Sequence, residues 1–341
     1  VILTSLLKEV SRSFYLTLRV LPRAIRPQIS LAYLLARTTD TIADTVIISL
    51  EQRLRSLADL REHILGRDRT PLDFGELARH QGPPAERVLL EHCEETLAIL
   101  DQFGSADREL IRQVLGIIIS GQELDLRRFA GAAETQVISL TTQPELEDYT
   151  YRVAGCVGEF WTKMCRARLF PRAAVDDRFL LENGVRFGKG LQLVNILRDL
   201  PEDLRQGRCY LPADSLATAG LAPAELLEPK NEGKFRPIYN QYLAQAEAHL
   251  TAGWAYTNAL PRSCARVRLA CAWPILIGMK TIAKLRVGNI LAAGQPIKIS
   301  RSEVKNLLLQ SVLYYPFPSV WRSLLPAPGQ GMESCCVPKS F

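Results

Sequence analysis

Two clusters of acidic residues stand far apart in the chain, each within an apolar, helix-like stretch. The first is Asp40-Thr-Ile-Ala-Asp44 and the second is Asp199-Leu-Pro-Glu202-Asp203. Residues three or four positions apart share one face of a helix, so each cluster presents several carboxylates to a small volume. Carboxylates this close repel one another, and Mg²⁺ commonly joins one or two of them to substrate phosphates. The spacing therefore predicts a site for Mg²⁺ and diphosphate, with all five acids as candidate metal ligands.

The residues around the first cluster argue against an ordinary solvated helix face. Tyr33, Arg37, Asp40 and Asp44 follow one another at steps of four, three and four. One helical stripe would therefore carry a phenol, a guanidinium and two carboxylates. Arg37 would either bind phosphate or only neutralise the acids.

The second cluster follows the same pattern. Gln192 and Asn195 precede Asp199 on the same helical face, and Arg198 stands beside it with the same two roles open. Buried polar groups without partners cost a few kcal/mol each, so such a stripe is unfavourable if it only packs. We therefore expect two facing helices that line a cavity, polar at its mouth and apolar below.

The elements that would position these residues are helices. Apolar residues recur at helical spacing along most of the chain, whereas the alternation typical of strands is scarce. Residues 70–84 and 220–233 are rich in Pro and Gly and predict surface loops. We expect one all-α domain over residues 1–325 and a flexible tail over 326–341. The predicted helices span about 28–46, 86–103, 107–129, 146–169, 177–199, 235–258 and 265–285.

Composition excludes several classes of protein. The net charge is +6, but Lys and Arg are dispersed, so nucleic acid is not expected as a partner. The scattered cysteines do not form a disulfide framework, and Cys156, Cys165 and Cys271 are expected in the core. No run of about twenty apolar residues occurs, which predicts a cytoplasmic protein without a membrane-spanning segment. The apolar, aromatic residues 307–321 either cap the core or form a patch for peripheral membrane contact, through which an apolar product would leave.

The motifs together resemble the squalene and phytoene synthases, which are trans head-to-head prenyl transferases with the all-α isoprenoid synthase fold. The resemblance rests on Ser11-Arg12-Ser13-Phe14, on residues 33–44, on Tyr149 with Val153-Ala-Gly-Cys-Val-Gly158, and on residues 192–212. These motifs occur in the family's order and span most of the chain. Residues 13–22 and 297–301 are more similar to squalene synthases than to phytoene synthases.

The resemblance implies a reaction in which two molecules of farnesyl diphosphate condense to presqualene diphosphate. It implies that Ser11, Arg12 and Ser13 bind substrate with Arg37, although Ser11 and Ser13 equally suit helix caps. It places Phe14 beside the reacting carbons, where an aromatic face stabilises a cation or simply packs in the core. Tyr149 is the candidate for assisting proton removal, which requires tuning by nearby charge because a neutral tyrosine is a poor base.

An apolar wall below the acids is needed to keep water from the cation. Val153, Val157 and Gly158 suit such a wall and are assigned to substrate binding by the resemblance, together with Tyr33, Gln192, Asn195 and Arg198. Close packing of two helices explains the small residues equally well.

A second half-reaction would reduce presqualene diphosphate to squalene with NADPH. No GxGxxG motif follows a strand, so a dinucleotide-binding domain is not expected. The resemblance instead points to Tyr33, Asn195, Lys298 and Arg301 as the cofactor site. Ser300 and Ala43 depart from the family's pattern at positions that affect the cofactor and the metal, respectively.

Pro201 interrupts the second acidic cluster. A proline inside a helix removes one backbone donor and bends or ends the helix, so Glu202 and Asp203 would be re-aimed relative to Asp199.

Other products remain open within the family. They are presqualene diphosphate itself, dehydrosqualene, hydroxysqualene and, from a longer substrate, phytoene. A different class of function is a catalytically inactive scaffold for membrane enzymes.

Overall fold

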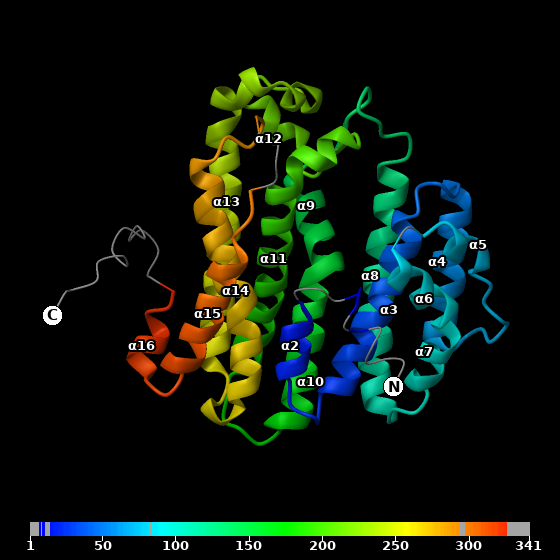
Figure 1. Ribbon diagram of the computed structural model, residues 1–341, viewed down its shortest axis with the longest axis vertical. Helices are drawn as coiled ribbons and strands as arrows, with labels where there is room; N and C mark the ends of the chain where they lie inside the picture. Colours follow the sequence, from blue (N-terminus) through cyan, green and yellow to red (C-terminus); the bar gives the residue numbers. More distant parts are fainter. Residues whose placement is uncertain (1–6, 8, 11–13, 82, 293–296, 326–341) are drawn as a thin grey trace.

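The long helices of the chain run side by side and build one all-α domain (Figure 1). The computed structural model describes residues 7, 9, 10, 15–81, 83–292 and 297–325. For Phe14 it describes the backbone but not the side chain. The all-α, single-domain prediction is confirmed. The predicted tail, 326–341, lies outside the described residues.

Helices in the first half of the described chain carry the first acidic cluster and the elements packed on it. Helix α3 carries Asp40 and Asp44 and packs against α8 and α4. The elements are α2 (Phe14–Val20), α3 (Arg26–Asp44), α4 (Leu50–Leu65), α5 (Gly75–Arg79), α6 (Pro84–Glu91), α7 (Cys93–Leu100) and α8 (Ser105–Arg128).

The middle of the chain carries Tyr149 and the second acidic cluster. A π-helical turn, η1 (Tyr151–Gly155), joins two α-helices into one continuous rod, and such turns are frequent at functional sites. The elements around it are β1 (Ile138–Ser139), α9 (Gln143–Thr150), α10 (Cys156–Leu169), α11 (Asp177–Arg205) and β2 (Arg208–Cys209).

The remaining elements pack on α11, on α13 or on one another. Helix α13 packs along α11 and α14 packs on α13. The elements are α12 (Ala213–Ala217), η2 (Pro223–Leu227), η3 (Pro229–Asn231), α13 (Glu232–Ala259), η4 (Arg262–Cys264), α14 (Ala265–Val287), α15 (Arg301–Tyr314) and α16 (Pro318–Arg322).

Local signals at the helix ends explain several boundaries. The Asp176 carboxylate accepts a hydrogen bond from the Phe179 amide at 3.0 Å and so caps α11. Ser49 caps α4 in the same way, and Gly66 ends that helix in the left-handed conformation with φ 73°. Ser300, a departure from the family's pattern, forms a capping box with Glu303 at the start of α15.

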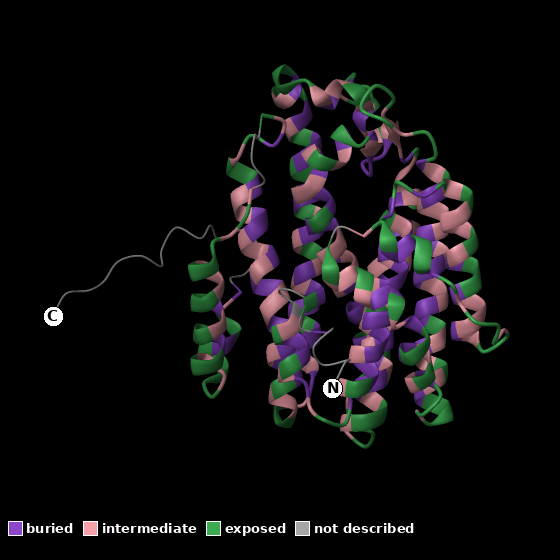
Figure 2. Ribbon diagram, turned by 45° about the vertical axis from the view of Figure 1, so that its right-hand side comes forward, coloured by how far each residue is buried: buried purple, intermediate pink, exposed green. Residues whose placement is uncertain are grey.

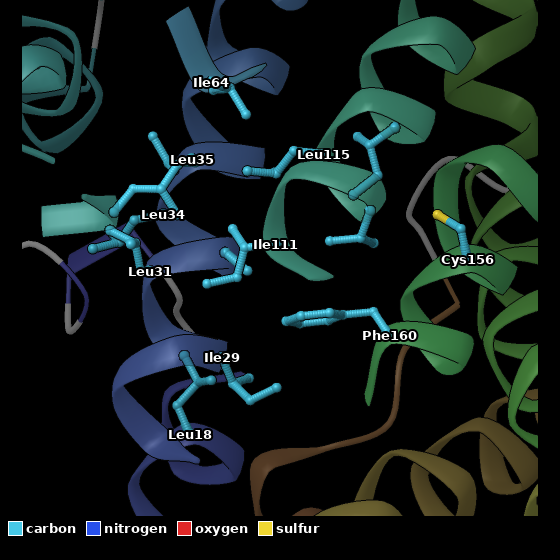
Figure 3. Packing of buried hydrophobic residues seen from close by; sticks show 14 of the residues in the cluster. Leu18, Ile29, Leu31, Leu34, Leu35, Ile64, Ile111, Leu115, Cys156 and Phe160 are labelled. Carbon is cyan, nitrogen blue, oxygen red and sulfur yellow. The ribbon is translucent and has the colours of Figure 1, made fainter. Parts of the chain in front are cut away.

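Buried residues line the inward faces of the long helices (Figure 2). One apolar cluster joins α3, α4 and α8 to α10, where the Phe160 ring points toward Ile111 (Figure 3). A second cluster joins α11, α13 and α14, and half-buried Phe187 packs against both. The predicted burial of Cys156, Cys165 and Cys271 is confirmed, and all three are free thiols.

The C-terminal apolar segment is buried only in part. Leu307 and Trp321 are buried, and the Trp321 ring stacks on Trp254 with centroids 5.2 Å apart. The rest of the segment presents exposed apolar side chains on α15 and α16: Leu309, Val312, Leu313, Phe317 and Val320. Within the described part of the chain, no helix has both the length and the apolar character needed to cross a bilayer.

Candidate active site

The first acidic pair is held between α3 and its neighbours. The Gln122 amide on α8 donates a hydrogen bond of 2.5 Å to Oδ1 of Asp40. The Arg37 guanidinium lies 3.8 Å from Oδ2 of Asp40 and also donates to Glu86 on α6 at 2.5 Å. Arg37 therefore contacts the carboxylates of Asp40 and Glu86, and the Gln122 amide binds the other oxygen of Asp40.

The electrostatic setting of this pair favours an incoming cation. Burial, followed by repulsion from Asp44, raises the pKa of Asp40 to about 7. Burial also raises the pKa of Asp44. The Asp40 side chain is nevertheless 46% exposed, so solvent and ions can reach it. A divalent cation would relieve the cost of keeping both carboxylates charged.

The second acidic pair lies in the last turns of α11. Arg198 grips Asp199 with two hydrogen bonds of 2.8 and 2.5 Å, a fork that fixes the carboxylate plane. Burial, and then repulsion from Asp199, raises the pKa of Asp203 to about 7. Glu202 is exposed, whereas Asp199 and Asp203 are half-buried.

Pro201 was expected to bend or end the helix. It does not end it, since α11 continues to Arg205.

Tyr149 connects the two acidic pairs. It is buried on α9, and burial raises the pKa of its hydroxyl well above the usual value. The charges of Asp125, Asp203 and Asp40 raise that pKa further, so carboxylates from α3, α8 and α11 all act on one phenol. One carboxylate of each predicted cluster therefore lies within electrostatic range of the same phenol.

Asp125, Tyr210 and Arg208 lie next to this phenol or to one another and were not predicted from the sequence. The Tyr210 ring stacks on Tyr149 with centroids 4.7 Å apart, and its hydroxyl donates to Asp125 at 2.9 Å. Burial raises the pKa of Asp125 to about 6. Arg208 faces Asp125 and Asp44, and it lines a cavity of about 160 Å³ with Asp125 and Arg53.

A sequence signal for some of these residues exists. Gln122 and Asp125 are three positions apart in an apolar helix, so they share one helical face, as the residues of each acidic cluster do. Arg208 follows the second cluster in the short strand β2, which pairs with β1 in parallel, and Tyr210 comes directly after this strand. Glu86 offers no such signal, because its role depends on how α6 packs on α3.

The small residues of the predicted wall serve close helix packing. A Cβ added to Gly158 would overlap the Gly184 carbonyl oxygen of α11, and one added to Gly188 would overlap the Ala154 carbonyl oxygen. Val153 is half-buried against the second apolar cluster, and Val157 is 38% exposed. The structure therefore favours the packing alternative for Gly158.

The polar face of α11 is open in its middle. Gln192 is half-buried and Asn195 is exposed, although their neighbours Leu193, Val194 and Ile196 are buried. Gln192 and Asn195 share the face of α11 that carries Asp199.

The remaining predicted residues divide into three groups. Tyr33 is half-buried on α3, and its hydroxyl donates to the Val10 carbonyl at 3.4 Å. Lys298 and Arg301 are exposed at the start of α15. Outside the described residues lie Ser11, Arg12, Ser13 and the Phe14 side chain.

The donor set fits Mg²⁺ that is shared with a substrate. In the described ranges, no three Asp, Glu, His or Cys side chains converge as a ready-made metal cage. The carboxylates instead form two pairs, each with one carboxylate within electrostatic range of Tyr149, and the buried oxygens Oε1 of Gln122 and Oδ1 of Asp125 have no hydrogen-bond partner. This arrangement suits an ion that keeps several waters and binds through one or two carboxylates and a diphosphate.

The raised pKa values predict how stability without Mg²⁺ depends on pH. An aspartate titrates near 3.9 in the unfolded chain but near 7 at Asp40 and Asp203 in the fold. Between these values the folded state binds more protons, so the free energy of unfolding should decrease as pH rises from about 4 to about 7. Thermal unfolding at pH 5 and pH 8, with and without Mg²⁺ and diphosphate, checks this. The Mg²⁺-induced rise in melting temperature should be larger at pH 8, and equal rises would contradict the assignment.

Comparison with known proteins agrees with the geometry. The family Squalene/phytoene synthase matches residues 7–303. A presqualene diphosphate synthase of Rhodopseudomonas palustris is 28% identical over 301 residues, covering 87% of this chain and 92% of that protein. A squalene synthase of Schizosaccharomyces pombe is 25% identical over 312 residues, which cover 90% of this chain and 64% of the relative.

Solved structures share the fold. A ligand complex of TcSQS superposes with a TM-score of 0.74 at 22% identity, covering 96% of this chain and 92% of that one. The two acidic pairs, the helices that carry them and the matched length together show that the chain belongs to the squalene/phytoene synthase family.

Proposed function

We propose that this protein is a squalene synthase that uses Mg²⁺ and NADPH. In the proposed reaction, two molecules of farnesyl diphosphate form presqualene diphosphate, which is then reduced to squalene. The observation that carries the proposal is the convergence of both acidic pairs on the buried Tyr149. Relatives named squalene synthase and presqualene diphosphate synthase support the substrate class.

In the first half-reaction, the C–O bond of one farnesyl diphosphate breaks and gives an allylic cation and diphosphate. Asp40, Asp44, Asp199 and Asp203 would hold Mg²⁺, which supplies positive charge to the oxygens of the leaving group. Arg37, Arg198 and Arg208 lie beside these acids, where guanidinium groups also bind diphosphate.

The cation then adds to the double bond of the second farnesyl diphosphate, and loss of one proton closes the cyclopropane ring. Burial, and then the charge of nearby carboxylates, raises the pKa of Tyr149, which favours the neutral phenol. A neutral phenol donates a hydrogen bond to the departed diphosphate, so we assign the proton to diphosphate and a positioning or relay role to Tyr149.

In the second half-reaction, loss of the second diphosphate and rearrangement would give a cation that is quenched by hydride from NADPH. Asn195 is exposed on the face of α11 that carries Asp199, which suits a contact with a cofactor that enters from outside. Tyr33, Lys298 and Arg301 remain candidates for the same cofactor.

We further propose peripheral contact with a membrane through the exposed apolar side chains of α15 and α16. A long hydrocarbon product partitions into lipid, and an apolar surface next to the fold would shorten its path.

Product analysis tests the proposed reaction. Purified protein is incubated with farnesyl diphosphate and Mg²⁺, with and without NADPH. Squalene that forms only with NADPH supports both half-reactions. Presqualene diphosphate, dehydrosqualene or hydroxysqualene in both samples would leave the first half-reaction standing and contradict the reduction.

Unchanged substrate requires two further measurements. Turnover of geranylgeranyl diphosphate would indicate a phytoene synthase. Mg²⁺-dependent binding of a nonhydrolysable farnesyl diphosphate analogue without turnover of any prenyl diphosphate would instead indicate the inactive scaffold.

A further inference from the structure

Pro201 leaves a gap in the hydrogen bonding of α11 at the second acidic cluster. In an α-helix the amide of residue 201 would donate to the carbonyl of residue 197, but proline has no amide hydrogen. Leu197 is fully buried, so water does not replace the missing donor. The helix nevertheless continues beyond Pro201 to Arg205.

The Tyr239 hydroxyl supplies the missing donor. It lies on α13, 42 positions along the chain, and donates to the Leu197 carbonyl oxygen at 3.0 Å. Tyr239 is fully buried, so this hydrogen bond forms away from competing water. A side chain of a neighbouring helix therefore replaces one backbone hydrogen bond of α11.

The Tyr239 ring is held in place by its own surroundings. The Phe235 ring packs against it with centroids 5.4 Å apart, and the Arg236 guanidinium lies 5.2 Å from its centroid. Arg236 is itself fixed, since it donates to the Leu285 carbonyl at 3.1 Å and pairs with Glu232. These contacts hold the Tyr239 side chain, and with it the hydroxyl, in one position.

The helical turn from Leu197 to Pro201 contains Asp199 and ends two residues before Asp203. Asp199 is two residues after Leu197, and Asp203 is two residues after Pro201. A proline that lacks a compensating contact kinks a helix, and a kink here would turn Asp203 away from the direction of Asp199. We propose that Tyr239 is a positioning residue whose hydroxyl replaces the amide missing at Pro201 and keeps Asp199 and Asp203 aimed at one Mg²⁺–diphosphate site.

A double-mutant cycle in unfolding tests the replacement of the amide, and this part is independent of the proposed function. The variants are Tyr239→Phe, Pro201→Ala and the double variant, measured by denaturant unfolding without metal. With Pro201 present, Tyr239→Phe should raise the unfolding equilibrium constant about tenfold or more, because a buried carbonyl loses its donor. In the Pro201→Ala background the restored amide donates to Leu197, so the same change should have an effect within about twofold.

Binding measures the positioning role, which rests on the proposed function. The probe is a nonhydrolysable farnesyl diphosphate analogue, and the readout is the Mg²⁺ concentration that gives half of the ligand-induced rise in melting temperature. Tyr239→Phe should raise this concentration about tenfold, which corresponds to about 1.4 kcal/mol, and Pro201→Ala should restore it.

Tyr256→Phe is the matched control. Tyr256 is a fully buried tyrosine of the same helix, but its hydroxyl accepts from Thr162 on α10 at 3.2 Å. This variant should leave the half-saturating Mg²⁺ concentration unchanged, and its effect on unfolding should be the same in the wild-type and Pro201→Ala backgrounds.

Equal effects of Tyr239→Phe in both backgrounds would overturn the replacement of the amide. Coupling in unfolding without a change in the Mg²⁺ concentration would overturn the positioning role and leave a structural one. If the wild-type protein shows no Mg²⁺-dependent binding, the proposed function fails and the positioning role fails with it. If Tyr239→Phe does not fold, folding of the double variant supports the proposal and failure of both opposes it.

Discussion

Replacing Asp40 or Asp199 with asparagine should lower prenyl diphosphate turnover by about a thousandfold or more. Each substitution keeps the size of the side chain and removes one negative charge from a pair that faces Tyr149. A bound metal contributes several kcal/mol to stabilising charge on a leaving group, and about 4 kcal/mol corresponds to a thousandfold in rate. Turnover is measured at saturating farnesyl diphosphate and Mg²⁺.

The control for this prediction is Asp59→Asn, which changes an exposed aspartate on α4. It should retain wild-type turnover, since the Asp59 carboxylate contributes nothing to the site. In Asp40→Asn the new amide oxygen still accepts the hydrogen bond from Gln122, so the melting temperature of this variant should remain close to that of the wild type. Near-normal turnover in both site variants would refute the metal-site assignment.

Gly158→Ala should reduce the free energy of unfolding by about 3 kcal/mol or more. The new Cβ would overlap the backbone carbonyl of Gly184, and two helix backbones have no flexible end that could move aside. Denaturant unfolding measures the loss. Because α10 and α11 carry the wall and the second acidic cluster, separating them should also weaken binding of the substrate analogue.

Gly116→Ala provides the comparison. Gly116 lies within α8, and a Cβ there would meet only the Leu65 side chain at 3.9 Å. Alanine is favoured over glycine in a helix, so this variant should be neutral or more stable by about 0.5–1 kcal/mol. If Gly158→Ala has wild-type stability but no longer binds the substrate analogue, Gly158 lines the substrate cavity and the packing interpretation is wrong.

The periodicity of apolar residues predicted most of the long helices. The helix expected over 177–199 extends to Arg205, and the one expected over 235–258 is Glu232–Ala259. The helix expected over 86–103 is two helices that meet at His92. Helix α15 was not predicted because its apolar residues do not follow one stripe, and several of them are exposed. Helix α4 was also missed, although Ser49 and Gly66 mark its ends.

The acidic clusters were recognisable because their chemistry is local. The spacing of Asp40 and Asp44, or of Asp199 and Asp203, fixes their common face as soon as the helix forms. The resemblance added Tyr149, and a carboxylate of each cluster raises the pKa of its hydroxyl, after burial. Spacing does not reveal Glu86 or Tyr239, because each acts on a partner more than 40 positions away.

The sequence by itself determined most of the long helices, the faces that carry the acids and the backbone amide that is missing at Pro201. These properties depend on contacts within a few residues, which the order of side chains dictates directly. Only the tertiary structure decided that Asp125 acts on the same tyrosine as the two acidic pairs and that Gly158 packs against Gly184. The same holds for Tyr239, whose hydroxyl donates to the Leu197 carbonyl of α11. Each of these depends on which helices lie side by side, and that choice is made by burial of the whole apolar surface rather than by any one segment.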